Sequence, residues 1–194
     1  MLEYRDVIGV DEAGRGPLFG PVVAACVYIL DTDDEIFDKI NDSKKLTEKK
    51  REQIYKELIV SDKIQYAVGV ASSEEIDKIN ILNATFLAMN RALEKLKITD
   101  KKVLVDGNQK IRGCKLEQDF LVKGDSKDLS IATASIIAKV YRDHLLYEYD
   151  EKYPLYGFKN HKGYGTKAHY EAIEKYGILK EHRKSFLKKI LMKW

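Results

Sequence analysis

The chain has 194 residues, of which 44% are hydrophobic, and a formal net charge of +3. This predicts one globular domain over residues 1–194, without internal repeats or linkers. No apolar stretch approaches the length of a transmembrane helix and no signal peptide is recognisable, so we expect no membrane insertion. The two cysteines, Cys26 and Cys114, have no CxxC partner. They indicate a reducing compartment, and we expect a cytoplasmic protein.

Apolar runs rich in Val and Ile at residues 6–11 and 21–30 predict two buried strands separated by a glycine loop. The first run ends in adjacent acids, Asp11 and Glu12. These repel each other and are expensive to bury unless a cation compensates them. The Gly-Arg-Gly loop at residues 14–16 follows at once. Its glycines let backbone amides approach a ligand, and its arginine suits a phosphate.

Capping residues mark the next predicted elements. Thr47 is placed to cap a helix that continues towards residue 60, and residues 63–71 alternate as a third strand. A serine at position 72 or 73 can cap a helix that starts at Glu74. Residues 83–96 follow with apolar side chains at helical spacing, so we expect core-facing helices.

The second half of the chain repeats the design of the first strand. Residues 102–106 form a short apolar strand ending in Asp106, and residues 120–122 precede a Lys-Gly-Asp sequence ending in Asp125. A helix rich in small residues is predicted over 129–149, and its small side chains would let it pack closely on the sheet. From residue 153 we expect one glycine-containing loop and then two helices.

Three apolar segments thus end in acids, namely Asp11 with Glu12, Asp106, and Asp125. Carboxylates converging at strand ends would make a site for a hard divalent cation such as Mg²⁺ or Mn²⁺. Two such ions could activate water and stabilise the leaving oxygen in phosphodiester hydrolysis. The alternatives are local: Asp125 could cap the following helix, and Asp106 could form an Asx turn with Gly107.

Other chemistries find less support. An apolar run ending in Asp-Glu also resembles the Walker B strand of an ATPase, but the chain contains no GxxxxGK[ST] loop. The four histidines form no zinc or catalytic-triad pattern, and we expect each to be at the surface or near a phosphate. They are His144, His161, His169 and His182.

Positive charge is concentrated at the C-terminus. Residues 152–194 contain 11 Lys and Arg against 3 Asp and Glu, whereas residues 1–151 contain 23 against 28. Tyrosines and Phe158 interleave with the lysines, a mixture that can bind phosphates and stack on sugars or bases. We expect residues 153–194 to be a basic, mainly helical substrate-binding portion. A solvated helical face would also explain the lysine excess.

Seven sequence blocks carry a family resemblance. They are DEAGRGP from Asp11, NDSKKL from Asn41, NILNAT from Asn80, LVDGN from Leu104, VKGDSKDLSIATASIIAKVYRD from Val122, HKGYGT from His161 and HRKSF from His182. In this order, over most of the chain, they resemble bacterial ribonuclease HII. The resemblance implies a ribonuclease H-like α/β fold, with a mixed central sheet flanked by helices and a helical C-terminal portion. It also implies hydrolysis of RNA in RNA–DNA hybrids, and nicking 5′ of single ribonucleotides in duplex DNA to leave 3′-hydroxyl and 5′-phosphate ends.

The resemblance also implies roles for individual residues. Four acids would bind Mn²⁺ or Mg²⁺ and carry catalysis: Asp11, Glu12, Asp106 and Asp125. The backbone of Gly14, Arg15 and Gly16 would contact the ribose 2′-OH and adjoining phosphates, and the 2′-OH is what separates RNA from DNA. Tyr164 would pack against the deoxyribose that follows the ribonucleotide. For Tyr164, the alternative is core packing at a loop edge.

Further substrate contacts are implied at five positions. Lys44 and Lys162 would contact phosphates, although either could be a solvated lysine. Ser43 would orient the loop that carries Lys44. Asn80 and Asn83 belong to a block near the substrate, and helix capping fits them nearly as well.

Two other functions stay open at this stage. One is another metal nuclease on the same fold, such as a resolvase or transposase-like enzyme, because fold does not define function. The other is a non-catalytic module that binds hybrids through the basic tail. The partners expected are RNA–DNA hybrids and ribonucleotide-containing duplex DNA. We expect a monomer without an obligate protein partner.

Overall fold

The computed structural model describes residues 1–41 and 46–188. Its centre is a five-stranded sheet of order β3-β2-β1-β4-β5. The first three strands in that order pair antiparallel, and β4 and β5 run parallel to β1, so the sheet is mixed as the resemblance implies. The strands are β1 (Ile8–Ala13), β2 (Val22–Ile29), β3 (Ile64–Ala71), β4 (Val103–Asp106) and β5 (Gln118–Leu121).

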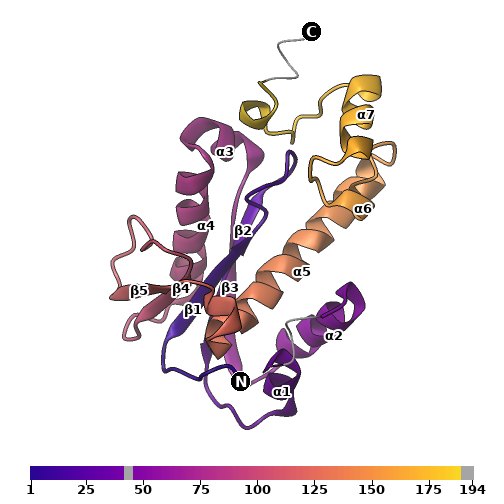
Figure 1. Ribbon diagram of the computed structural model, residues 1–194. Helices are drawn as coiled ribbons and strands as arrows, with labels where there is room; N and C mark the ends of the chain where they lie inside the picture. Colours follow the sequence, from indigo (N-terminus) through magenta and orange to yellow (C-terminus); the bar gives the residue numbers. More distant parts are fainter. Residues whose placement is uncertain (42–45, 189–194) are drawn as a thin grey trace.

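Helices cover both faces of the sheet (Figure 1). One face packs against α3 (Ser73–Ile79) and α4 (Ile81–Leu96). The other packs against α1 (Glu35–Asn41), α2 (Glu48–Leu58) and the long α5 (Leu129–Lys152). Beyond α5 the chain forms α6 (Phe158–His161), α7 (Lys167–Tyr176) and a 3-10 turn at Lys184–Phe186. Among the described residues, no helix is both long enough and apolar enough to cross a membrane.

Capping residues and apolar patterns in the sequence predicted most of these helices and strands. The predicted cap at Thr47 is confirmed, because its side chain accepts a hydrogen bond from the Lys50 amide at 3.3 Å. Of the two candidate serines, Ser72 caps α3, and Glu75 completes a reciprocal capping box. The sequence analysis did not predict α1. It also ended the first strand too early, since β1 continues to Ala13 and therefore contains both acids.

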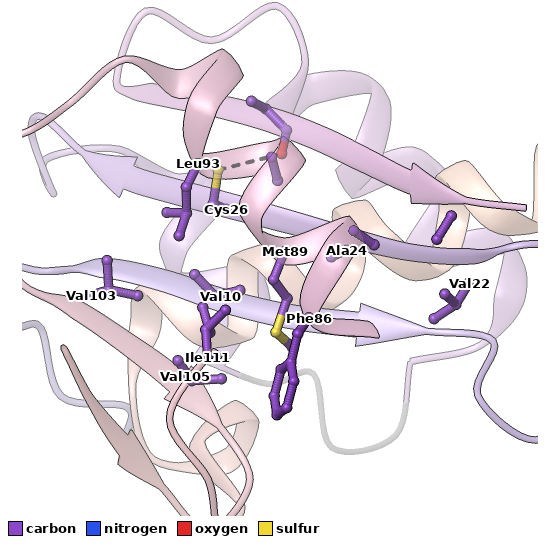
Figure 2. Close-up of a cluster of buried hydrophobic side chains, with 14 of the residues drawn as sticks. Val10, Val22, Ala24, Cys26, Phe86, Met89, Leu93, Val103, Val105 and Ile111 are labelled. Carbon is purple, nitrogen blue, oxygen red and sulfur yellow. Dashed lines mark hydrogen bonds between the residues drawn. The ribbon is translucent and has the colours of Figure 1, made fainter. Parts of the chain in front are cut away.

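Alternation along the central strands produces two hydrophobic cores. Val22, Ala24 and Cys26 of β2 point to the core beneath α4, shown in Figure 2 with Met89 of that helix. The intervening residues of β2 point to a second core beneath α5. The thiol of Cys26 is buried, which raises its pKa to about 12, and it donates to the Ala67 carbonyl at 3.7 Å. This environment suits a permanently reduced, unreactive cysteine.

The approach of α5 to β1 is unusually close. A Cβ placed on Gly9 would lie 2.3 Å from the carbonyl carbon of Ser130 and 2.4 Å from the Ile131 nitrogen. Only glycine allows β1 and the first turn of α5 to touch backbone to backbone. This contact brings the following turns of α5 beside the acids at the end of β1.

Candidate active site

The strand register brings the first two predicted acids together. Val10 of β1 pairs with Val105 of the parallel strand β4. Asp11 and Asp106 each follow these paired residues, so they lie on neighbouring strands at the same edge of the sheet. Asp11 is only 6% exposed. The convergence predicted from three separate segments therefore holds for these two.

A tight turn after β5 adds Asp125. The amide of Gly124 donates to Oδ1 of Asp106 at 2.6 Å, which fixes the turn Gly124–Ser126 against the end of β4. The side chain that caps α5 belongs to Asp128, which accepts from the Ile131 amide at 3.0 Å. Helix capping by Asp125 is therefore wrong. Its exposed carboxylate stands beside Asp106.

Burial and mutual repulsion disfavour ionisation of the acids. Burial raises the pKa of Asp11 well above its ordinary value, and the charges of Glu12 and Asp106 add to the effect. Burial likewise raises the pKa of Glu12, against the attraction of the Arg15 guanidinium, which lies 3.4 Å away. Burial also raises the pKa of Asp106, and the Asp125 charge contributes to the rise. The cluster thus gathers several acids, of which Glu12 pairs with Arg15.

The donor set fits a hard divalent ion. It consists of carboxylate oxygens at one edge of the sheet, and a positive charge there would reverse the unfavourable ionisation of all three buried acids. Across residues 1–41 and 46–188, no three Asp, Glu, His or Cys side chains are already gathered closely enough to hold an ion by themselves. Water and substrate phosphate oxygens would have to complete the coordination, which is usual for Mg²⁺.

A groove of about 520 Å³ runs past this edge. It is lined by Glu12, the Gly-Arg-Gly loop and Tyr164, and also by Arg51 of α2 and Lys139 of α5, which we call the basic wall. A smaller adjoining cavity of about 70 Å³ shares Glu12 and Arg15 and is lined by Asp106. The groove is therefore lined by both acidic and basic side chains.

Tyr164 lies at the mouth of this groove. Its side chain is 44% exposed, and a Cβ on Gly16 would sit 3.4 Å from its ring. Core packing, the alternative for this tyrosine, is wrong at this exposure. The structure brings the loop at residues 14–16 and Tyr164 together, although about 150 residues separate them in the chain.

Buried histidines hold the backbone beneath Tyr164. His182 Nδ1 accepts from the Leu179 amide at 2.8 Å, so its Nε2 carries the proton and donates to His169 Nε2 at 3.1 Å. His169 Nδ1 then donates to the Tyr164 carbonyl at 2.9 Å. His161 stacks on His169 with 4.4 Å between ring centroids. Surface or phosphate-adjacent positions are wrong for His169 and His182, which are 0% and 1% exposed.

This histidine relay predicts a loss of stability in acid. Burial lowers the pKa of His169 to about 4 and of His182 to about 3, from an ordinary value of 6.5. At pH values between the lowered pKa of each histidine and 6.5, the unfolded chain binds more protons than the folded one. The free energy of unfolding therefore falls as the pH drops below 6.5. Each histidine contributes up to about 1.4 kcal/mol per pH unit. Urea unfolding at several pH values should give a shallower dependence below pH 6.5 for His182→Gln than for the wild type.

The control for this prediction is His144→Gln, which removes a histidine that lies outside the relay and pairs with Glu52 at 2.8 Å. Unfolding is measured in chelator, so that metal binding does not contribute. Equal pH slopes for wild type and His182→Gln would contradict the relay.

The remaining predicted contacts are placed differently. Ser43 and Lys44 lie outside the described residues. The ammonium of Lys162 is turned away from solvent and bonds to the Lys159 carbonyl at 2.5 Å and to Glu48 at 3.4 Å, above the ring of Tyr147. It is therefore not a freely solvated lysine, and its contact with a substrate phosphate stays a prediction.

Asn80 and Asn83 lie at the start of α4. Asn80 caps the helix, accepting from the Asn83 amide at 3.0 Å, as the capping alternative predicts. The Asn83 side chain donates to the Ile79 carbonyl and accepts from Arg112 at 3.2 Å. Neither lines the groove. Their contact with substrate stays a prediction.

The sequence analysis missed the basic wall of the groove. Ser135, Lys139 and Arg142 recur at helical spacing along one face of α5, and all three line the groove. Lys139 is held by the buried Asp143 at 2.7 Å. This spacing was a usable signal, because polar residues that recur on one face of a helix mark a face that does not belong to the apolar core.

Comparison with known proteins gives a consistent result. The family model for Ribonuclease HII matches residues 8–190. The chain is 58% identical to the Ribonuclease HII of Fusobacterium nucleatum, over 98% of this chain and 89% of the relative. It is 55% identical to that of Clostridioides difficile, over 97% of this chain and 72% of the relative. Among solved structures, the RNase HII of the Archaeoglobus fulgidus PCNA:RNase HII complex superposes with a TM-score of 0.77 at 26% identity, covering 92% of this chain and 94% of that one.

Proposed function

The chain belongs to the ribonuclease HII family, whose members are endoribonucleases acting on RNA–DNA hybrids, and on this premise we propose how its own residues select and cut a substrate. We propose that it nicks duplex DNA on the 5′ side of a single embedded ribonucleotide, leaving a 3′-hydroxyl and a 5′-phosphate. One observation carries the proposal. Glu12, Asp125, the Gly-Arg-Gly loop and an exposed Tyr164 line one groove, and Asp106 lines the small cavity that adjoins it.

The four acids would hold the divalent cation. Asp11, Glu12 and Asp106 have raised pKa values from burial, and the exposed Asp125 stands next to Asp106. A bound Mn²⁺ or Mg²⁺ would stabilise charge on the scissile phosphate and activate the attacking water. The protein contributes position: the ends of β1 and β4 are rigid, and the Gly124 amide orients the Asp106 carboxylate.

Sugar selection would be carried out by the part of the groove that residues 14–16 and Tyr164 line. The amides of residues 14–16 can donate to a ribose 2′-OH and its phosphate, because glycine leaves the backbone accessible. Tyr164 would cover the next sugar, which must be a deoxyribose to fit against the ring. Arg51 and Lys139, which line the same groove, would bind phosphates of the nucleic-acid backbone.

Three duplexes of one sequence test the proposal, each 5′-labelled on the same strand. One is all DNA, one has a single ribonucleotide, and one has RNA in the labelled strand. Each is incubated with Mn²⁺, Mg²⁺ or chelator, and products are sized against a ladder with defined ends. We expect one metal-dependent nick 5′ of the ribonucleotide, cuts throughout the RNA strand, and an intact DNA duplex.

Other outcomes select the other functions. Cutting of the all-DNA duplex at a comparable rate would favour a resolvase-like or transposase-like nuclease. Binding of the hybrid without cleavage under any metal condition would favour a non-catalytic module. The Archaeoglobus fulgidus relative was solved with PCNA, so a protein partner is open for this chain, and a monomer without an obligate partner stays a prediction.

A further inference from the structure

Two arginines are buried directly beneath the Gly-Arg-Gly loop. Arg142 of α5 is 1% exposed and Arg183, which follows α7, is 0% exposed. In the described chain neither forms an ion pair with a carboxylate. An unpaired buried charge is costly, and this burial lowers the pKa of Arg142 to about 10 and of Arg183 to about 9. Both stay charged near neutrality, so hydrogen bonds must offset the cost.

Every guanidinium hydrogen bond of the pair goes to a backbone carbonyl. Arg183 donates to the carbonyls of Gly14 at 2.5 Å, Arg15 at 2.9 Å and Gly20 at 2.9 Å. Arg142 donates to those of Phe19 at 3.0 Å, Pro21 at 3.1 Å and Lys162 at 3.0 Å. The two side chains therefore grip both ends of the loop from residue 14 to residue 21. We call them the arginine clamp.

The clamp dictates which way the loop amides point. In a trans peptide the N–H is directed opposite to the C=O. Because Arg183 draws the Gly14 and Arg15 carbonyls inward, the amides of Arg15 and Gly16 point away from it. Neither amide donates to another residue of the described chain. Gly14 is required at this point, since its φ is +95° and a Cβ would lie 2.1 Å from the Arg142 Nε.

The clamp also sets the spacing between the two halves of the sugar site. Arg142 bonds the loop at Phe19 and Pro21, and its third bond goes to Lys162, two residues before Tyr164. We propose that Arg183 and Arg142 are positioning residues for sugar selection: they aim the amides of Arg15 and Gly16 and fix their separation from Tyr164. This rests on the proposed function and adds to it the groups that make the loop selective.

The test uses Arg183→Lys, which keeps the positive charge. The three donors of lysine share one nitrogen, so they cannot reach the three separate carbonyls that the planar guanidinium bonds. This variant is combined with Asp11→Asn so that nothing is cut. Fluorescence anisotropy then compares duplexes with a ribose or a deoxyribose at one position. We expect the ribose-over-deoxyribose affinity ratio to fall about tenfold, because small misplacements at a positioned site are expensive. In the variant with Asp11 intact, we expect the same fall in the ratio of single-ribonucleotide nicking to cutting of the plain hybrid.

Controls separate positioning from folding. Arg91→Lys is the matched control, because Arg91 also donates to a backbone carbonyl, that of Val70 at 2.7 Å, but does not line the groove. It should leave the sugar ratio unchanged. Urea unfolding checks that each variant folds cooperatively. If Arg183→Lys does not fold, Arg142→Lys is measured in the same way.

The outcomes are distinct. A folded clamp variant with the wild-type sugar ratio overturns the inference and leaves the proposed function intact. If the protein with an intact clamp does not distinguish ribose from deoxyribose, the proposed function itself is overturned. A fall in the ratio for the clamp variant, with an unchanged ratio for Arg91→Lys, supports the inference.

Discussion

An Asp11→Asn variant is expected to lose cleavage and to gain stability when metal is absent. If Asp11 holds the metal as proposed, its loss should lower kcat by about 1,000-fold or more, since bound ions supply several kcal/mol of transition-state stabilisation. Binding of the hybrid should stay measurable, because the loop at residues 14–16 and the basic wall are untouched.

The stability half of this prediction follows from electrostatics. Burial and the neighbouring charges of Glu12 and Asp106 raise the pKa of Asp11 above the ordinary value of 3.8, so the folded chain loses stability as the pH rises above that ordinary value. A neutral asparagine of the same shape removes this loss. The free energy of unfolding in chelator should therefore rise above that of the wild type.

Metal titration completes the test. Mn²⁺ should raise the Tm of the wild type, because an ion that binds only the folded state stabilises it, and should raise that of Asp11→Asn much less. Asp62→Asn is the matched control, since Asp62 is an exposed carboxylate between α2 and β3. Undiminished cleavage by Asp11→Asn in metal-replete buffer would remove Asp11 from the catalytic set.

A Tyr164→Ala variant is expected to lose selectivity more than affinity. The ring is 44% exposed beside Gly16, so it can meet a sugar without any rearrangement of the core. Contacts of nucleotides with aromatic rings are worth about 1–3 kcal/mol, so the ratio of single-ribonucleotide nicking to plain-hybrid cutting should fall about tenfold or more. Overall hybrid affinity should change less, because phosphate contacts dominate it.

Tyr164→Phe is the control, because it keeps the ring and removes only the hydroxyl. It should retain most of the selectivity. An unchanged nicking ratio for Tyr164→Ala would show that the ring does not monitor the sugar, whatever its effect on total activity.

Local chemistry explains which parts of the fold were predictable. The side chains of Thr47 and Ser72 accept hydrogen bonds from amides in the first turn of the helices that follow them. Each residue therefore predicts the start of its helix from the sequence alone. The convergence of Asp11 and Asp106 was predictable because each ends an apolar strand, and a carboxylate at such a position is costly unless it is compensated. In contrast, β1 was predicted to end at Asp11, since the acids interrupt its apolar pattern although pairing with β2 continues to Ala13.

Long-range contacts explain what could not be predicted. Arg183 bonds to the Gly14 carbonyl, 169 residues earlier, and no local pattern marks that pairing. The basic tail appeared to be a uniform surface for nucleic acid, yet Lys162 binds Glu48 and Arg183 is buried. His169 and His182 likewise became a buried pair only through the packing of the C-terminal helices.

Ser135, Lys139 and Arg142 lie in a row along one face of α5, so this one helix fixes the distance between the groups that the two ends of the row contact. Ser135 bonds to Asp11 at one end of this row, and at the other end, about 10 Å along the helix axis, Arg142 bonds to the loop for which we propose sugar selection. Because Gly9 seats the first turn of α5 on β1, a shift of the helix would move both ends together. A displacement of α5 should therefore affect cleavage and sugar selection together, and an engineered change of specificity would start from the loops rather than from the position of this helix.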